Sequence, residues 1–300
     1  MVTDRTALKI RGLAMSTEIT ELAIKLSAAS IRRSWDVYSA FDWPETLPEN
    51  TWYMSPELIS LYGTSYFDSL TEAQQQKLSF TEICNFFSLV CQGERPLVQG
   101  LVHRLYLKKT HKDVTDYLHH FIDEENKHMI MFGTFLYRYF GKVYPEKKIT
   151  IEREYAKGEE ELEFFCKVLV VEEIGDYYNL AMRADERIHP LIQEINKVHH
   201  ADETRHLAFG RQYLPELFEQ YASDWSEETL AGFREWFVNY LKSSWGDYYN
   251  PTMYKDAGLE NGYELRQMGM KNSAGLRQKA SQKLVDLFLK TGILQEAPEI

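Results

Sequence analysis

Two Glu-x-x-His sequences are the residues of this chain best suited to chemistry. Glu125-Asn-Lys-His128 and Glu203-Thr-Arg-His206 each place a carboxylate three positions before an imidazole. On an α-helix, residues at this spacing differ by roughly 60° around the axis, so both side chains lie on one face. Each pair stands within a stripe of apolar residues at helical spacing, which indicates that it faces a protein core.

Lone glutamates precede both pairs at equal distances. Glu94 and Glu172 each stand 31 positions before the glutamate of the following pair. A glutamate from each of two helices and a Glu-x-x-His from each of two others form the ligand set of the carboxylate-bridged di-metal bundle. Four carboxylates balance two divalent ions, whereas without metal they would repel one another and lose their hydration. The sequence therefore predicts a buried di-metal centre, with Glu173 as an alternative to Glu172.

Acidic residues also stand directly before the glutamates of the two pairs. Metal-bound imidazoles usually donate their second N–H to a carboxylate, and Glu124 and Asp202 are placed to accept. We expect crossed pairs, in which Asp202 holds His128 and Glu124 holds His206. The alternative is that both acids are solvated charges on the helix surface.

Helical periodicity over residues 71–215 predicts an all-α, ferritin-like four-helix bundle that positions these side chains. The expected helices run from about Thr71, with a capping box to Gln74, to Lys109; from a cap at Asp113 to Gly141; from Lys157 to Arg183; and from Pro190 to Leu214. Gly93 and Pro96 should kink the first of them. We expect one domain over residues 1–300, with an amino-terminal helix and loop over 16–62 and further helices over 226–290.

The composition excludes several classes of protein. A net charge of −11 over 300 residues argues against a nucleic-acid partner, which requires clustered Lys and Arg. The chain has no apolar run of membrane-spanning length and no signal-peptide layout, so we expect a cytosolic protein that does not bind membranes. Cys84, Cys91 and Cys166 stand among apolar neighbours without a CxxC motif and are interpreted as buried thiols.

A further histidine gives the fourth predicted helix a more specific pattern. In the run His199-x-x-x-Glu203-x-x-His206, all three side chains project from one helix face. This run resembles the p-aminobenzoate N-oxygenase family, the di-iron arylamine oxygenases of antibiotic pathways. The segment NPTMYKDAGLENGYELR is similar to the tail of that family, so the resemblance covers roughly residues 71–266. Glu94 stands closer to its Glu-x-x-His pair than the family pattern implies, which leaves Glu82 as an alternative.

The resemblance implies a ligand set and a reaction. Three histidines and four glutamates would surround two iron ions, and the matching positions are Glu94, Glu125, His128, Glu172, His199, Glu203 and His206. With O₂ as co-substrate, such a centre would oxidise a primary amine, free or carrier-bound, to a hydroxylamine, nitroso or nitro product in secondary metabolism. An external electron donor is implied because the chain has no flavin or nicotinamide motif. A homodimer is left open.

Three alternatives remain at this stage. A di-iron oxidase that hydroxylates or desaturates carbon would share six of the ligands but would not need His199. A ferroxidase would share them too, though such bundles are usually shorter. A bundle without metal is the non-enzymatic alternative, and its buried carboxylates would make it costly.

Overall fold

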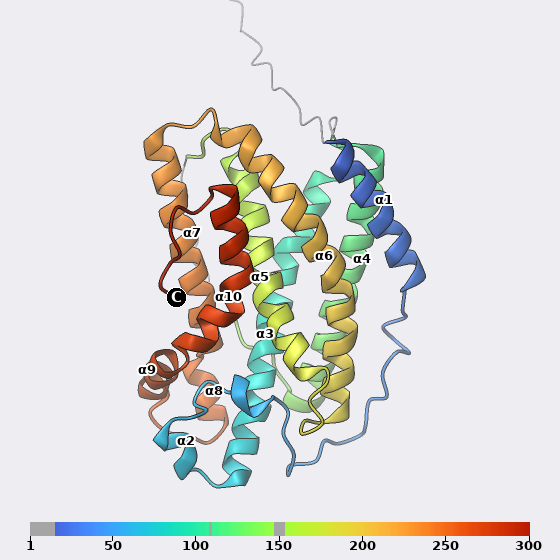
Figure 1. The fold of residues 1–300 in the computed structure, drawn as a ribbon. Coiled ribbons are helices and arrows are strands. Elements are labelled where there is room, and N and C mark those ends of the chain that lie inside the picture. The colour runs from blue at the N-terminus through green and yellow to red at the C-terminus, as the bar shows by residue number, and fades with distance from the viewer. Residues whose placement is uncertain (1–15, 108–109, 147–153) are drawn as a thin grey trace, which may run out of the picture.

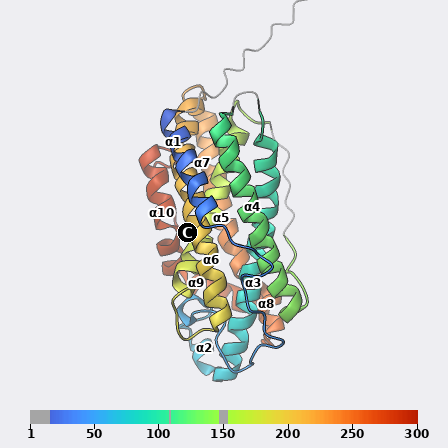
Figure 2. The same cartoon turned by 90° about the vertical axis from the view of Figure 1, so that its right-hand side faces the viewer.

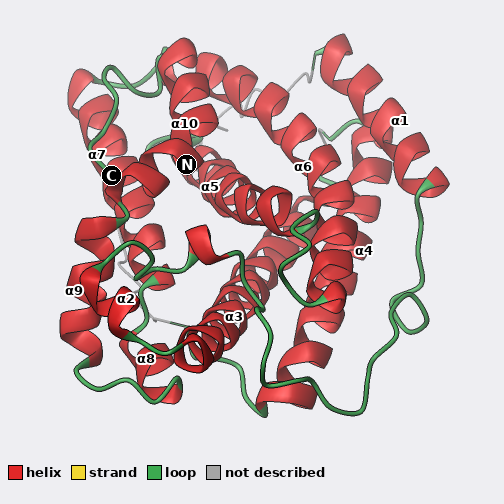
Figure 3. Ribbon diagram, turned by 60° about the horizontal axis from the view of Figure 1, so that its bottom comes forward, coloured by secondary structure: helices red, strands yellow, loops and turns green. Residues whose placement is uncertain are grey.

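Helices joined by loops make up the computed structural model, which describes residues 16–107, 110–146 and 154–300 (Figure 1, Figure 3). Within these ranges no residue belongs to a β-strand, and one isolated bridge joins Trp52 to Ile188. The predicted all-α class is confirmed. The helix that contains Pro96, α3 (Glu72–Arg104), continues through this residue without a break. The buried apolar residues form one continuous core. The single-domain assignment over residues 1–300 stays a prediction.

Four long helices form the ferritin-like bundle that the periodicity predicts (Figure 1). They are α3 (Glu72–Arg104), α4 (Lys112–Phe135), α5 (Glu159–Met182) and α6 (Pro190–Ala222). The helix α3 packs against α4, and α5 packs against α6. Close approach of α3 and α5 depends on Gly100, because a Cβ atom there would lie 2.0 Å from the ring of Phe164.

The ends of these helices follow local chemistry with two differences from expectation. Thr71 and Gln74 form the predicted capping box of α3, and Gly141, with φ of 80°, ends the π-helical turn Leu136–Phe140 that follows α4. The prediction that Asp113 caps α4 is wrong. His111 is the cap, and its Nδ1 accepts from the backbone N–H of Asp113, which lies in the first turn.

The helix α6 also continues two turns beyond the predicted end at Leu214. Pro215 inside it lacks the N–H that would bond to the carbonyl of Arg211. Leu214 and Leu217 are both fully buried, and their burial stabilises a helix that the local rule alone would end.

The remaining helices cover the bundle. α1 (Thr17–Arg32) lies across α4 and α6 (Figure 2), while α7 (Glu227–Tyr248) and α10 (Ala274–Thr291) cover α5. The short helices α2 (Ser65–Ser69), η1 (Pro56–Leu58), α8 (Pro251–Asp256) and α9 (Gly262–Asn272) gather at one end (Figure 1). The aromatic segment 245–254 is largely helical, and its residues Trp245, Tyr249 and Tyr254 are buried.

Two smaller expectations concern membrane-spanning helices and the cysteine thiols. Across the described helices, none is both long and apolar enough to cross a membrane. Cys84 and Cys166 are buried and Cys91 is half-buried, and all three are free thiols. Burial raises the pKa of each of these thiols, so none has the low pKa of a reactive cysteine.

Candidate metal centre

All seven predicted ligands meet in the middle of the bundle, and each is at most 5% exposed. One comes from α3, two from α4, one from α5 and three from α6, in the order Glu94; Glu125 and His128; Glu172; His199, Glu203 and His206. Their ligand atoms form two groups of four residues, and within each group these atoms lie within 4.8 Å of one another. Helical spacing within α4 and α6 thus places each Glu-x-x-His pair on the inner face.

The first group contains two histidines. It consists of Glu94, His128, His199 and Glu203. Oε1 of Glu94 lies 3.6 Å from both Nδ1 of His128 and Nε2 of His199. Oε1 of Glu203 lies 3.4 Å from Nδ1 of His128 and 2.7 Å from Nε2 of His199. Two imidazole nitrogens and two carboxylates therefore surround one small volume, which suits a divalent transition metal.

The second group contains one histidine and three carboxylates. It consists of Glu125, Glu172, Glu203 and His206. Nδ1 of His206 lies 2.8 Å from Oε1 of Glu125 and 3.2 Å from Oε2 of Glu203. The two groups thus differ in their donors, since the first has one more neutral nitrogen and the second has one more carboxylate.

Two carboxylates join the groups. Glu203 belongs to both, with Oε1 facing His128 and Oε2 facing His206. Glu125 is arranged in the same way, because its Oε2 lies 3.5 Å from Nδ1 of His128 while its Oε1 faces His206. A carboxylate with one oxygen toward each group can bridge two metal ions.

Buried atoms without hydrogen-bond partners test whether a metal fits. Both carboxylate oxygens of Glu94, both of Glu125, Oε1 of Glu203 and Nδ1 of His128 have no hydrogen-bond partner in the part of the chain that the structure describes. Such atoms cost about 1–3 kcal/mol each, and more when charged, unless something else satisfies them. All six belong to residues that form the two groups, so a pair of cations bound there would offer them partners. The residues fit a di-metal cofactor.

The geometry distinguishes the neighbouring glutamates. Glu172 contributes an oxygen to the second group, whereas Glu173 accepts from Nε of Arg211 at 2.5 Å. Glu82 lies outside both groups and accepts from the backbone N–H and the hydroxyl of Ser60, at 3.0 and 2.5 Å. The arrangement therefore favours Glu172 and Glu94 as ligands, and that role stays a prediction.

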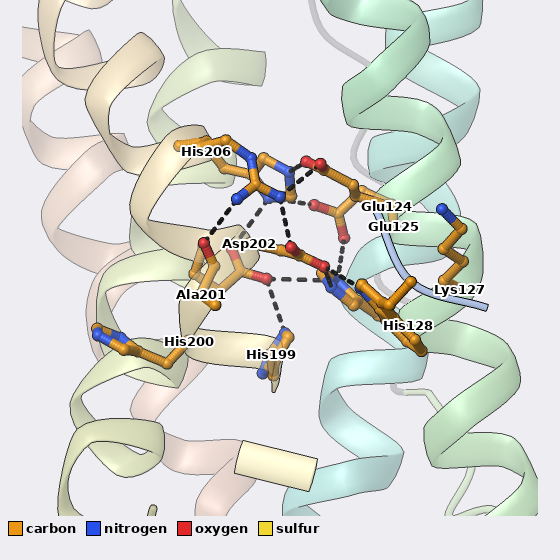
Figure 4. Close-up of polar contacts among 12 residues, drawn as sticks. Glu124, Glu125, Lys127, His128, His199, His200, Ala201, Asp202 and His206 are labelled. Atoms are coloured by element: carbon orange, nitrogen blue, oxygen red, sulfur yellow. Dashed lines mark hydrogen bonds and ion pairs between the residues drawn. The ribbon is translucent and has the colours of Figure 1, made fainter. Parts of the chain in front are cut away.

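Carboxylates hold the remote nitrogens of two histidines, as Figure 4 shows between α4 and α6. Nε2 of His128 lies 3.1 Å from Oδ2 of Asp202, and Nε2 of His206 lies 2.9 Å from Oε2 of Glu124. An ionised carboxylate only accepts, so each Nε2 carries a proton and each Nδ1 is the nitrogen that faces the centre. The structure places the crossed pairs where the sequence predicts them.

Two further residues complete this outer layer and were missed from the sequence. Arg205 donates from one guanidinium nitrogen to both Glu124, at 2.5 Å, and Asp202. Trp35 donates its indole N–H to Asp202 at 2.8 Å, and its ring stacks at 6.4 Å from that of His128. Arg205 lies inside the Glu-x-x-His motif, which could have drawn attention to it. No sequence signal connects Trp35 to a residue 167 positions away.

Without metal, the charges of the centre compete. Burial raises the pKa of Glu94 and of Glu203. Burial acts to raise the pKa of Glu125, but His206 and His128 outweigh it and lower this pKa to about 2. Burial also opposes charge on His206, yet the carboxylates Glu203 and Glu125 raise its pKa. The centre therefore gathers buried carboxylates whose charged form is stabilised by a nearby cation.

The other histidines of the chain lie outside the centre. His200 points away from the centre (Figure 4) and its Nδ1 lies 2.5 Å from Oδ1 of Asp176. The remaining histidines also lie outside both groups: His103, His111, His119, His120 and His189. Tyr178 stacks on Phe86 and meets the ring of Tyr248 at a tilt of 39°, so it contributes to packing.

Comparisons with known proteins identify a family for this chain. The family model described as P-aminobenzoate N-oxygenase AurF matches residues 16–292. Similar curated proteins are the uncharacterized proteins Rv0885 of Mycobacterium tuberculosis and Mb0909 of Mycobacterium bovis. Each is 24% identical over 212 residues, which cover 67% of this chain and 62% of the relative. The match thus spans less than two thirds of those relatives.

Similar solved structures are R2-like ligand-binding oxidases. A mutant with an anaerobically reconstituted Mn/Fe cofactor is 16% identical, with a TM-score of 0.46 over 86% of this chain and 92% of that chain. The form without metal cofactor is also 16% identical, with a TM-score of 0.41 over 86% of this chain and 96% of that chain.

Proposed function

Because the chain belongs to the p-aminobenzoate N-oxygenase AurF family, we propose that it holds two iron ions and uses O₂ to N-oxygenate a primary amine. The product would be a hydroxylamine, nitroso or nitro compound of secondary metabolism. Membership of this family supports an oxidoreductase. One observation supports the di-metal centre most strongly: six buried atoms of its residues lack hydrogen-bond partners, and those residues form two groups that share a carboxylate.

The chain's own residues hold the two ions. Glu94, His128 and His199 would bind one ion, Glu172 and His206 the other, and Glu125 and Glu203 would bridge them. When bound, the iron pair would supply the reduction of O₂ and the oxidising power for attack on the amine nitrogen. Four carboxylates would neutralise two divalent cations.

Outer residues fix the direction of the ligands. Asp202 and Glu124 accept from Nε2 of His128 and His206, so Nδ1 is the nitrogen of each ring that is directed inward. Arg205 donates to both of these carboxylates, so one buried guanidinium holds the two acids that contact the imidazoles.

Aromatic side chains exclude water from the centre. The ring of Phe121 stacks on His206 with centroids 3.8 Å apart, and the ring of Phe132 meets His199 edge-on at 4.9 Å. All four residues are at most 3% exposed. A dry environment strengthens electrostatic interactions inside it and prevents hydrolysis of reactive species.

Partners follow from the chemistry of the reaction. Dioxygen activation at a di-iron centre consumes electrons, so we propose an external electron donor, and the amine substrate would be a small molecule or a carrier-bound group. We propose a cytosolic location, with no role for nucleic acid or membrane.

Metal and product analyses test the function. Protein reconstituted with Fe(II) under anaerobic conditions should hold two irons per chain. Exposure to isotope-labelled O₂ with a panel of primary amines should place the label on nitrogen, detected by mass spectrometry. Label on carbon, or no labelled product from protein with two irons, would contradict the proposal.

His199 separates N-oxygenation from general di-iron oxidase chemistry. His199→Ala should keep its helical content and much of its iron but lose amine oxygenation at least about tenfold, equivalent to roughly 1.4 kcal/mol of barrier. Turnover normalised to bound iron measures this loss. Normal turnover per iron would mean that His199 is a core histidine.

A further inference from the structure

His199 is held differently from the other two histidines of the centre. Its Nδ1 lies 3.1 Å from Oδ1 of Asn179, a residue of α5 that is fully buried. In His128 and His206, Nδ1 instead faces the centre and Nε2 donates to a carboxylate. His199 therefore presents the opposite nitrogen, Nε2, to the first group.

We propose that Asn179 is a positioning residue that fixes His199 in its Nδ1–H tautomer, so that the Nε2 lone pair faces the metal position. The inference rests on the proposed function, since it assigns a role in holding that metal. A neutral imidazole has one N–H, and an amide oxygen only accepts. An acceptor at Nδ1 therefore places the proton there and leaves Nε2 free to bind a cation.

The neutral amide has a second consequence. A carboxylate partner raises the basicity of a ligating imidazole, as Asp202 and Glu124 do for His128 and His206. Asn179 carries no charge, so His199 would be the weakest donor of the three towards a bound metal. The first group thus contains one firmly held imidazole and one weakly held imidazole.

A rotated amide is the competing arrangement. If Asn179 turned its NH₂ group to Nδ1, the proton of His199 would move to Nε2 and be donated to Oε1 of Glu203, 2.7 Å away. His199 would then be an ordinary hydrogen-bonded core histidine. The two arrangements differ in which nitrogen carries the proton before any metal is added.

Histidine tautomers can be read directly by NMR. The full chain would be labelled with heavy nitrogen in its nine histidines, and long-range proton–nitrogen spectra recorded without metal and with Zn²⁺. The His199 signals are those that disappear in His199→Gln. We expect Nδ1–H in the metal-free protein and, with zinc, Nδ1–H and a metal-bound Nε2.

Three variants complete the experiment. In Asn179→Leu, His199 should lose its preference for the Nδ1–H tautomer in the metal-free protein. The affinity for one of the two zinc ions, measured by chelator competition, should fall about tenfold. Asn179→Asp should restore the tautomer and bind zinc at least as tightly as the natural protein. Asn196→Leu is the matched control: Asn196 is also fully buried, but its side chain donates to the carbonyl of Ile192, so His199 should be unaffected.

Each outcome decides the matter. Nε2–H in the metal-free natural protein would overturn the inference, because the metal rather than Asn179 would then select the tautomer. Unchanged tautomer and zinc affinity in Asn179→Leu would also overturn it, and the proposed function would stand if two irons and N-oxygenation were still found. A natural protein that binds neither zinc nor iron in pairs would refute the proposed function, and the inference with it.

Discussion

Arg205 lies between the two carboxylates that hold His128 and His206, so replacing it with methionine should weaken the fold through both. The side chains of Arg205, Glu124 and Asp202 are each at most 6% exposed. Removing one partner of a buried ion pair costs about 3–5 kcal/mol, because it leaves a buried charge without compensation. At this chain length, such a loss should lower the melting temperature of the metal-free protein by roughly 5–8 °C.

The chain offers a matched control for this measurement. Arg187 also joins two carboxylates, Glu57 and Asp185, at 2.7–2.8 Å, but half of its side chain is exposed. Solvent screens that arrangement, so Arg187→Met should cost at most about 1 kcal/mol. Urea unfolding of both metal-free variants gives the two free energies. Equal losses would refute the view that burial makes Arg205 the structural anchor of the outer layer.

Three further predictions concern metal and pH. Glu203→Ala should bind at most one iron per chain because a bridging ligand is lost. The control variant Glu82→Gln should keep two irons. Metal analysis that finds two irons in Glu203→Ala would exclude the bridging role of Glu203. Chelation of the metals should lower the melting temperature while circular dichroism still shows a helical apo-protein, since bound metal at about 100 times its Kd adds roughly 2.7 kcal/mol; an unchanged melting temperature after verified metal removal argues against a buried centre. Burial raises the pKa of Glu82 to about 8 from 4.5, so the folded state holds a proton that the unfolded state releases, and stability should fall as pH rises from about 4.5 to 8. Glu82→Gln should remove that decline and add roughly 3 kcal/mol at neutral pH; parallel stability–pH curves for the two proteins would show that Glu82 titrates normally.

The bundle and its seven inner residues could be predicted because their signals are local. A Glu-x-x-His pair defines one helix face by itself, and two such pairs preceded by glutamates at one spacing leave few other arrangements. Adjacent residues were harder. Glu172 and Glu173 differ by about 100° around the helix, and only the position of Arg211 shows which one turns away from the centre.

Contacts between distant segments could not be predicted. Trp35 and Asn179 reach the histidines from outside the motifs, and their roles depend on how α1 and α5 dock. The short helix α8 is another case, because Met253 and Tyr254 are buried within it and no local sequence pattern shows that burial. Tertiary packing decided these elements, and a single sequence does not contain it in readable form.

The indole of Trp35 also gives the protein an optical property. Its ring is nearly parallel to that of His128, with an interplanar angle of 18°, and its N–H reaches the carboxylate behind that imidazole. A paramagnetic ion bound to the far side of the imidazole would quench the fluorescence of so near an indole, whereas Zn²⁺ would not. Trp35 is one of six tryptophans, and the difference between the natural protein and Trp35→Phe isolates its emission. Iron loading and loss can therefore be followed in real time without any added dye.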